Sequence, residues 1–176
     1  MMHAAVLALV LAAAPPPLAV DPGPLPVGFT VIRKTDTSRK LNEKEPWPVE
    51  IGLWYPAASG GEPLRYRDYV ALDGEVEGYR KFLRGNGVMT EAGIDAWLDA
   101  PLLARRDARA RPGRFPVVLI GGGMGGALAD QAVLAEHLAS RGYVVATTPS
   151  PVRLGVPMES DADVLPMAQA QQRDLE

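Results

Sequence analysis

The feature that most constrains this fold is a short apolar stretch that runs directly into a cluster of glycines. Residues Phe115–Gly126 read FPVVLIGGGMGG. A helical pattern follows over Ala127–Arg141, and a second apolar stretch covers Tyr143–Thr147. A strand, a glycine loop, a helix and a strand in this order predict a βαβ unit. The loop lies where a strand ends and a helix begins, which is where open α/β sheets bind ligands.

The glycine loop suits two different chemistries. Consecutive glycines let backbone N–H groups approach a ligand closely, because no Cβ atom stands in the way. Such a loop can bind a phosphate group, or it can stabilise the oxyanion of a reacting carbonyl. The residues around the loop are needed to separate these two interpretations.

Two strands are predicted upstream of this unit, over Phe29–Thr35 and Val49–Tyr55. Apolar and polar residues alternate in the second stretch, which is the period of a half-buried strand. The polar residues 36–46 between the two stretches make a hairpin-like connection plausible, so we expect the strands to pair antiparallel. A glycine-containing loop is predicted over residues 57–63.

Helical spacing dominates much of the segment between the two strand regions. Val76–Leu83 has the spacing of a helix, and Gly85–Gly87 is expected to stop it. Thr90 is expected to cap a second short helix. Residues 105–114 hold five arginines and predict a solvated linker, and a last helix is expected from Ser160 onward.

Composition excludes several classes of function. The chain has 176 residues, 47% hydrophobic and 22% charged, with a formal net charge of -3. This balance gives no support for nucleic-acid binding, which usually leaves a basic footprint. The chain contains no cysteine, so disulfides, zinc–thiolate sites and thiol catalysis are excluded.

The N-terminus is typical of an exported protein. Ala4–Ala14 is an uninterrupted apolar run, too short to span a bilayer comfortably, and small and proline residues follow it. This pattern predicts a signal peptide over residues 1–20, a domain over residues 21–176, and a secreted or periplasmic location. A buried apolar N-terminal helix is the alternative. No other segment is long and apolar enough to cross a membrane.

One interpretation of the glycine loop is a dinucleotide site. Gly121, Gly123 and Gly126 satisfy G-x-G-x-x-G between a strand and a helix. That site also needs an acidic residue near the end of the next strand to bind a ribose hydroxyl. The strand ends at residues 146–149, which read ATTP and contain no acid, although Arg153 could meet a 2′-phosphate. A nicotinamide-dinucleotide-binding oxidoreductase domain remains an alternative.

Three stretches carry a resemblance to a known family. They are Pro48–Ala57 (PVEIGLWYPA), Phe115–Ile120 (FPVVLI) and Leu134–Ala146 (LAEHLASRGYVVA). The chain resembles the N-terminal half of the α/β-hydrolase superfamily, in the platelet-activating-factor acetylhydrolase and dienelactone-hydrolase-like group. The resemblance implies an α/β fold with two antiparallel edge strands followed by a parallel strand–loop–helix–strand unit.

The same resemblance implies a role for the glycine loop. The family loop usually reads His-Gly-x-Gly-Gly. Here Gly122 stands at the histidine position and Gly123 matches the first glycine. Met124 takes the position whose backbone N–H serves the oxyanion hole. Gly123 and Met124 are therefore the candidate site residues, and no cofactor or metal is implied.

The other catalytic residues of that family are missing from this sequence. The family nucleophile lies in G-x-S-x-G, and none of the five serines, Ser38, Ser59, Ser140, Ser150 and Ser160, has glycines at both flanking positions. The histidines are His3 and His137, and His137 is expected to be a helix-surface or interhelical residue rather than a catalytic base. A Ser-His-Asp triad therefore cannot be assembled from these residues.

The sequence predicts the N-terminal portion of a secreted serine ester hydrolase, truncated before the nucleophile and inactive as it stands. The intact enzyme would hydrolyse a small carboxylic ester, lactone or acetyl ester. A non-enzymatic relic or interaction module of the same fold is a further alternative.

Overall fold

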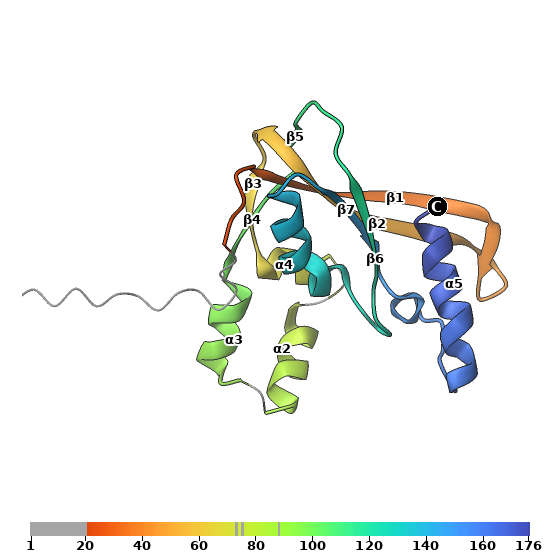
Figure 1. Ribbon diagram of the computed structural model, residues 1–176. Coiled ribbons are helices and arrows are strands. Elements are labelled where there is room, and N and C mark those ends of the chain that lie inside the picture. Colours follow the sequence, from red (N-terminus) through yellow and green to blue (C-terminus); the bar gives the residue numbers. More distant parts are fainter. Residues whose placement is uncertain (1–20, 73, 75, 88) are drawn as a thin grey trace, which may run out of the picture.

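The computed structural model describes residues 21–72, 74, 76–87 and 89–176 (Figure 1). The predicted signal peptide lies outside the described residues. The elements in chain order are β1 (Val27–Leu41), β2 (Glu45–Ser59), β3 (Glu62–Arg65), α1 (Tyr66–Val70), α2 (Val76–Gly85), α3 (Glu91–Leu98), β4 (Pro101–Arg106), β5 (Arg109–Ala110), β6 (Val117–Gly121), α4 (Leu128–Ala139), β7 (Val144–Thr148), the 3-10 turns η1 (Pro151–Leu154) and η2 (Asp161–Asp163), and α5 (Val164–Asp174).

The strands form one mixed sheet in the order β3-β4-β1-β2-β7-β6, with β5 paired to β2. β1 and β2 form a long antiparallel hairpin, and β7 runs antiparallel to β2 on its other side. β6 and β7 are parallel, with Val117 opposite Val144 and Gly121 opposite Thr148. Both predicted pairings are confirmed: the upstream strands are antiparallel, and the strands that flank the glycine loop and its helix are parallel.

The core lies between the sheet and α1 and α4. Phe29, Trp54 and Tyr69 are fully buried, and their ring centroids are 4.7–5.8 Å apart. Alanines of α4 pack against them, because small side chains let the helix approach the sheet closely. Ala132 and Ala135 belong to the apolar stripe that the sequence shows, and both have no exposed surface.

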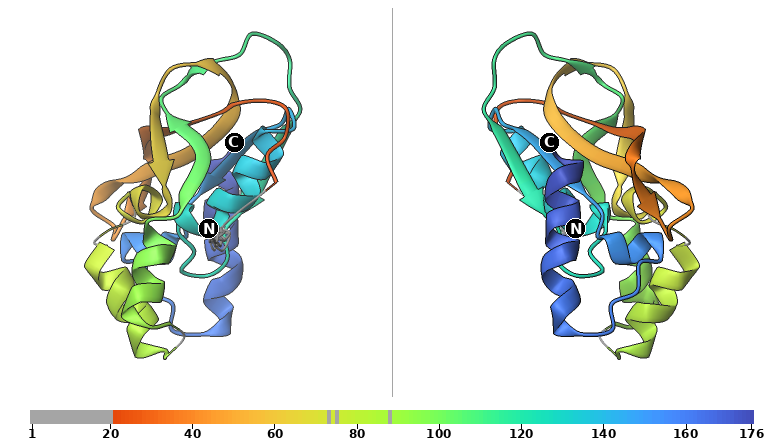
Figure 2. Two further views of the ribbon diagram at one scale, coloured as in Figure 1. Left: turned by 90° about the vertical axis from the view of Figure 1, so that its left-hand side faces the viewer. Right: turned by 90° about the vertical axis from the view of Figure 1, so that its right-hand side faces the viewer.

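The long α4 and α5 helices cover opposite faces of the sheet. Trp54 and Trp47 are seven residues apart on β2, and side chains an odd number apart point to opposite faces of a strand. The Trp54 indole donates to Tyr69 of α1, which packs beside α4. The Trp47 indole donates to Asp174 of α5. Figure 2 shows these two helices on either side of the twisted sheet.

Two local predictions are wrong in part. The loop expected over residues 57–63 is shorter, because β2 continues to Ser59 and β3 begins at Glu62. The linker expected over residues 105–114 contains the end of β4 and the whole of β5. In β5, Ala110 pairs with Ala57 at the far end of β2. Pairing with a distant strand, which local composition does not encode, makes these polar residues extended.

The sheet ends at β6, which within the described residues pairs with β7 alone. Val117 and Leu119, two residues apart on this strand, are 62% and 57% exposed. An open edge with exposed apolar side chains is a template for pairing with another strand.

Candidate active site at the glycine loop

The loop between β6 and α4 turns through a tight, glycine-dependent bend. The Gly126 N–H donates to the Gly123 carbonyl at 2.8 Å, and Gly125 has a positive φ of 70°. This is the pattern of a type II turn, with Met124 and Gly125 as its two central residues. A Cβ on Gly126 would lie 2.8 Å from the Gly123 oxygen. Gly125 and Gly126 are therefore needed for the bend itself.

The candidate oxyanion donor lies at the tip of this turn. Met124 is 66% exposed, and no described residue accepts a hydrogen bond from its backbone N–H. Gly123 precedes it and accepts the bond that closes the turn. The amide of Met124 is thus available to a ligand oxygen, which is the property that an oxyanion donor requires.

The loop is anchored at both of its ends. Before the turn, the Thr147 hydroxyl donates to the Ile120 carbonyl at 2.7 Å. After the turn, the Asp130 carboxylate accepts from the Ala127 N–H at 2.8 Å and caps α4. The Ser150 N–H donates to the Gly126 carbonyl at 2.9 Å. These bonds set the turn at the carboxyl ends of β6 and β7, as the βαβ pattern predicts.

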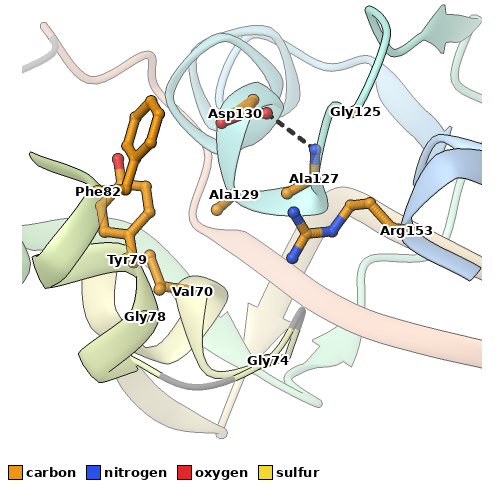
Figure 3. Close-up of a pocket in the computed structure, with 10 residues that line it drawn as sticks. All are labelled: Val70, Gly74, Gly78, Tyr79, Phe82, Gly125, Ala127, Ala129, Asp130 and Arg153. Atoms are coloured by element: carbon orange, nitrogen blue, oxygen red, sulfur yellow. Dashed lines mark hydrogen bonds between the residues drawn. The ribbon is translucent and has the colours of Figure 1, made fainter. Parts of the chain in front are cut away.

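A cavity of about 500 Å³ opens beside the loop (Figure 3). Gly125 and the first turn of α4 form one wall of this cavity, α2 forms the opposite wall, and Arg153 of η1 projects into it. Its volume lies within the range of small-molecule sites. Met124 and Gly123 are not among its described lining residues, although Met124 is the chain neighbour of Gly125, which does line it.

Two aromatic residues of α2 line this cavity, and sequence reasoning did not identify them as site residues. Tyr79 and Phe82 have ring centroids 6.5 Å apart, with planes inclined by 29°. Their helical spacing predicts a packed face, and Leu83 of the same helix is buried as expected. Phe82, in contrast, is 63% exposed. The spacing alone does not distinguish a core residue from a pocket residue.

A second hollow lies on the other side of the loop, between β6 and α5. Gly121, Gly122, Leu119 and Leu175 are among its lining residues. Gln171 also lines it, and its buried side-chain nitrogen has no hydrogen-bond partner among the described residues. The glycine loop therefore separates two hollows, one bounded by α2 and one bounded by α5.

His137 lies apart from the loop, in the last turn of α4. Its Nδ1 is 3.1 Å from an Arg141 guanidinium nitrogen, and the Ser140 hydroxyl donates to its carbonyl. His137 is thus a partly buried helix residue, and the prediction that it lies on a helix is confirmed. Ser150 is the serine whose backbone bonds to the loop, whereas His137 lies in the last turn of α4.

Replacement of Gly125 by alanine is expected to lower the free energy of unfolding by about 1–2 kcal/mol, because an L side chain is strained at a positive φ. Thermal or denaturant unfolding measures the change. Gly85→Ala is the matched control, since Gly85 ends α2 in open space with no positive φ. An equal loss in both variants would contradict the turn assignment.

Neither a metal site nor a membrane helix is found in the described part of the chain. No group of three or more His, Asp or Glu side chains is placed there to hold a metal ion. No helix of residues 21–176, apart from the undescribed positions, combines the length and apolar character that crossing a bilayer requires.

Comparison with known proteins supports the hydrolase-like fold. No family model matches the chain, and no curated protein matches it. Among solved structures, the chain is similar to a ferulic acid esterase from Streptomyces cinnamoneus, with 25% sequence identity and a TM-score of 0.52. The match covers 76% of this chain and 34% of that one. The chain therefore spans about a third of the esterase's length. The predicted fold class, part of an α/β-hydrolase-like sheet, is confirmed.

Proposed function

We propose that this chain is the N-terminal part of a secreted serine ester hydrolase, in which the glycine loop supplies the oxyanion hole. The Met124 N–H donates to the carbonyl oxygen of a bound ester, and Gly123 holds the turn that presents this amide. The oxygen gains negative charge when a nucleophile attacks, so a fixed donor stabilises the transition state more than the ground state. The observation that carries the proposal is the Met124 amide, which no described residue pairs, in the loop that follows the parallel strand β6.

Three further findings support this assignment. The sheet order places the loop strand β6 beside β7, with the antiparallel hairpin next to β7, as the family resemblance implies. The solved structure that the chain resembles is an esterase. β7 ends at Thr147 and Thr148, and neither can supply the carboxylate that a dinucleotide ribose needs. The proposed substrate is a small ester or lactone, of the kind hydrolysed by the platelet-activating-factor acetylhydrolase and dienelactone-hydrolase-like group.

The nucleophile, acid and catalytic histidine are proposed to come from polypeptide beyond these 176 residues. We therefore expect the recombinant 176-residue chain neither to hydrolyse p-nitrophenyl acetate nor to react with a fluorophosphonate, which labels activated serines. The native product, captured from the source culture medium with an antibody against this chain, is expected to be longer and to be labelled. Gel mobility and fluorescence of the probe measure both properties.

Two variants test the amide itself in the labelled native product. Met124→Pro removes the N–H while suiting this position of a type II turn, and Met124→Ala keeps the N–H. The rate of labelling by the fluorophosphonate should fall in Met124→Pro and stay at the wild-type value in Met124→Ala. A native product of 176 residues that is not labelled would favour a non-enzymatic module. Labelling of the short chain that one serine substitution abolishes would reveal a triad within it.

A further inference from the structure

We infer that α2 provides an aromatic platform for the ring of a neutral aryl ester whose carbonyl lies at the glycine loop. This inference rests on the proposed function and adds the class of substrate. The platform consists of Tyr79 and Phe82, which line the cavity beside the loop. Figure 3 shows both rings on the side of the cavity that faces the start of α4.

The exposure of Phe82 is the first argument. Phe82 is 63% exposed although it belongs to a helix that buries Leu83 against the core. The plane of its ring is inclined by 29° to that of Tyr79, with ring centroids 6.5 Å apart. A ligand ring that covers this face would remove apolar surface from water and would add an aromatic contact.

The rigidity of the platform is the second argument. Tyr79 packs against Tyr66, with ring centroids 6.2 Å apart. Tyr66 in turn packs edge-on against Trp97, with ring centroids 5.5 Å apart. Tyr66 is buried, and burial raises its pKa, so its phenol stays neutral. Phe82 is thus the exposed end of an aromatic chain that is anchored in the core. A preformed face of this kind loses little entropy when a ligand binds.

The charge of the cavity favours a neutral ligand. Asp130 and Arg153 both line it and carry opposite charges. The Asp130 carboxylate is already engaged with the Ala127 N–H. Among the described lining residues, one acidic and one basic side chain are therefore present, and neither sign of charge dominates.

The position of the loop supplies the ester part of the inference. Gly125 lines the same cavity as Tyr79 and Phe82, and Met124 is its neighbour in the turn. A ligand with its ring on α2 therefore has its other end beside the turn that carries the free amide. A volume of about 500 Å³ holds a single-ring ester.

Titration of the ¹⁵N-labelled 176-residue chain tests the inference without turnover. Methyl benzoate and phenyl acetate place the ring on the acid and alcohol sides of the ester, and methyl cyclohexanecarboxylate lacks aromaticity. At least one of the two aryl esters is expected to shift the amide signals of Gly125 and Ala127 and to bind more tightly than the cyclohexyl ester. Phe82→Ala is expected to weaken the aryl ester by about 2- to 10-fold and the cyclohexyl ester less.

Leu165→Ala is the matched control, because Leu165 is 65% exposed on α5 and does not line this cavity. Its affinity for each ester should equal that of the wild type. An aryl-ester affinity that is unchanged in Phe82→Ala overturns the inference. Ligand-induced shifts of amide signals that are confined to Gly121 and Gly122, beside α5, overturn it as well. Failure of the proposed function looks different: the aryl ester binds through Phe82, but the Met124 amide does not respond to it.

Discussion

Replacing Arg39 by methionine is expected to lower the free energy of unfolding by about 3–5 kcal/mol. Arg39 lies on β1 and bonds to the carboxylates of Asp36 and Asp174, and its guanidinium stacks 5.0 Å above the Trp47 ring. It also donates to the Ala170 carbonyl at 3.3 Å. The Asp174 side chain is 3% exposed. Removal of Arg39 would leave this buried carboxylate without its cationic partner.

The structural consequence concerns α5. Asp174 is the last residue of that helix, and the Trp47 indole also donates to it, at 3.1 Å. Arg39 and Trp47 both belong to the long β1–β2 hairpin. Together they tie the helix that lines one side of the glycine loop to strands more than a hundred residues earlier in the chain. Urea unfolding followed by circular dichroism measures the loss, and hydrogen exchange should show α5 opening first.

Arg33→Met is the matched control for this prediction. Arg33 bonds to Glu50 at 2.6 Å on the same hairpin, but the two side chains are 59% and 22% exposed. Surface ion pairs of this kind contribute about 1 kcal/mol or less. The double variant Arg39→Met/Asp174→Leu should recover much of the loss, since no buried charge remains unpaired. A loss in Arg39→Met no larger than in Arg33→Met would show that α5 is held by other contacts.

The stability of the chain is expected to fall by about 3 kcal/mol through Glu136 alone as pH rises from below 4.5 to above 7. Glu136 lies on α4 and is 1% exposed. Its carboxylate accepts from the Tyr69 hydroxyl at 2.6 Å and from the Leu103 N–H. Burial raises its pKa from 4.5 to about 7, and the donors only partly offset this. Tyr69 stays neutral, because burial and the adjacent carboxyl raise its pKa as well.

The direction of the effect follows from proton binding. Between pH 4.5 and 7 the folded chain holds a proton on Glu136 that the unfolded chain has released, so rising pH favours unfolding. The contribution is fully present below pH 4.5 and is lost above pH 7. Glu136→Gln removes the titration, and its amide can imitate the protonated acid by donating to the Tyr69 oxygen. The unfolding free energy of this variant minus that of the wild type should therefore become more positive as pH rises.

Glu62→Gln is the control for the pH series, because Glu62 is exposed at the start of β3. Its unfolding free energy should follow that of the wild type at every pH. A Glu136→Gln variant that runs parallel to the wild type between pH 4.5 and 8 would contradict the raised pKa. A variant that loses stability relative to the wild type as pH rises would indicate that the ionised carboxylate is the stabilised form.

Local order was largely predictable from the sequence. The apolar runs that end at Ile120 and at Thr147 predict β6 and β7, and the apolar stripe between them predicts α4. Thr90 caps α3 as expected, with its hydroxyl accepting the Gly93 N–H at 3.2 Å. These features are readable because each depends on residues within a few positions of one another. The glycine loop was predictable for the same reason, since its bend is closed by atoms three residues apart.

Contacts between distant segments were decided by the tertiary structure alone. The end of β4 and the whole of β5 are extended because they pair with β1, β2 and β3, whereas the composition of residues 105–114 indicates a linker. Phe82 borders a cavity because α2 faces the start of α4 across it. Arg39 is partly buried because Asp174, 135 positions later in the chain, lies beside it. Composition and periodicity report the polarity of a residue and its local repeat. They do not report which remote surface packs against it, and that packing defines both the second wall of the site and the partners of the buried charges.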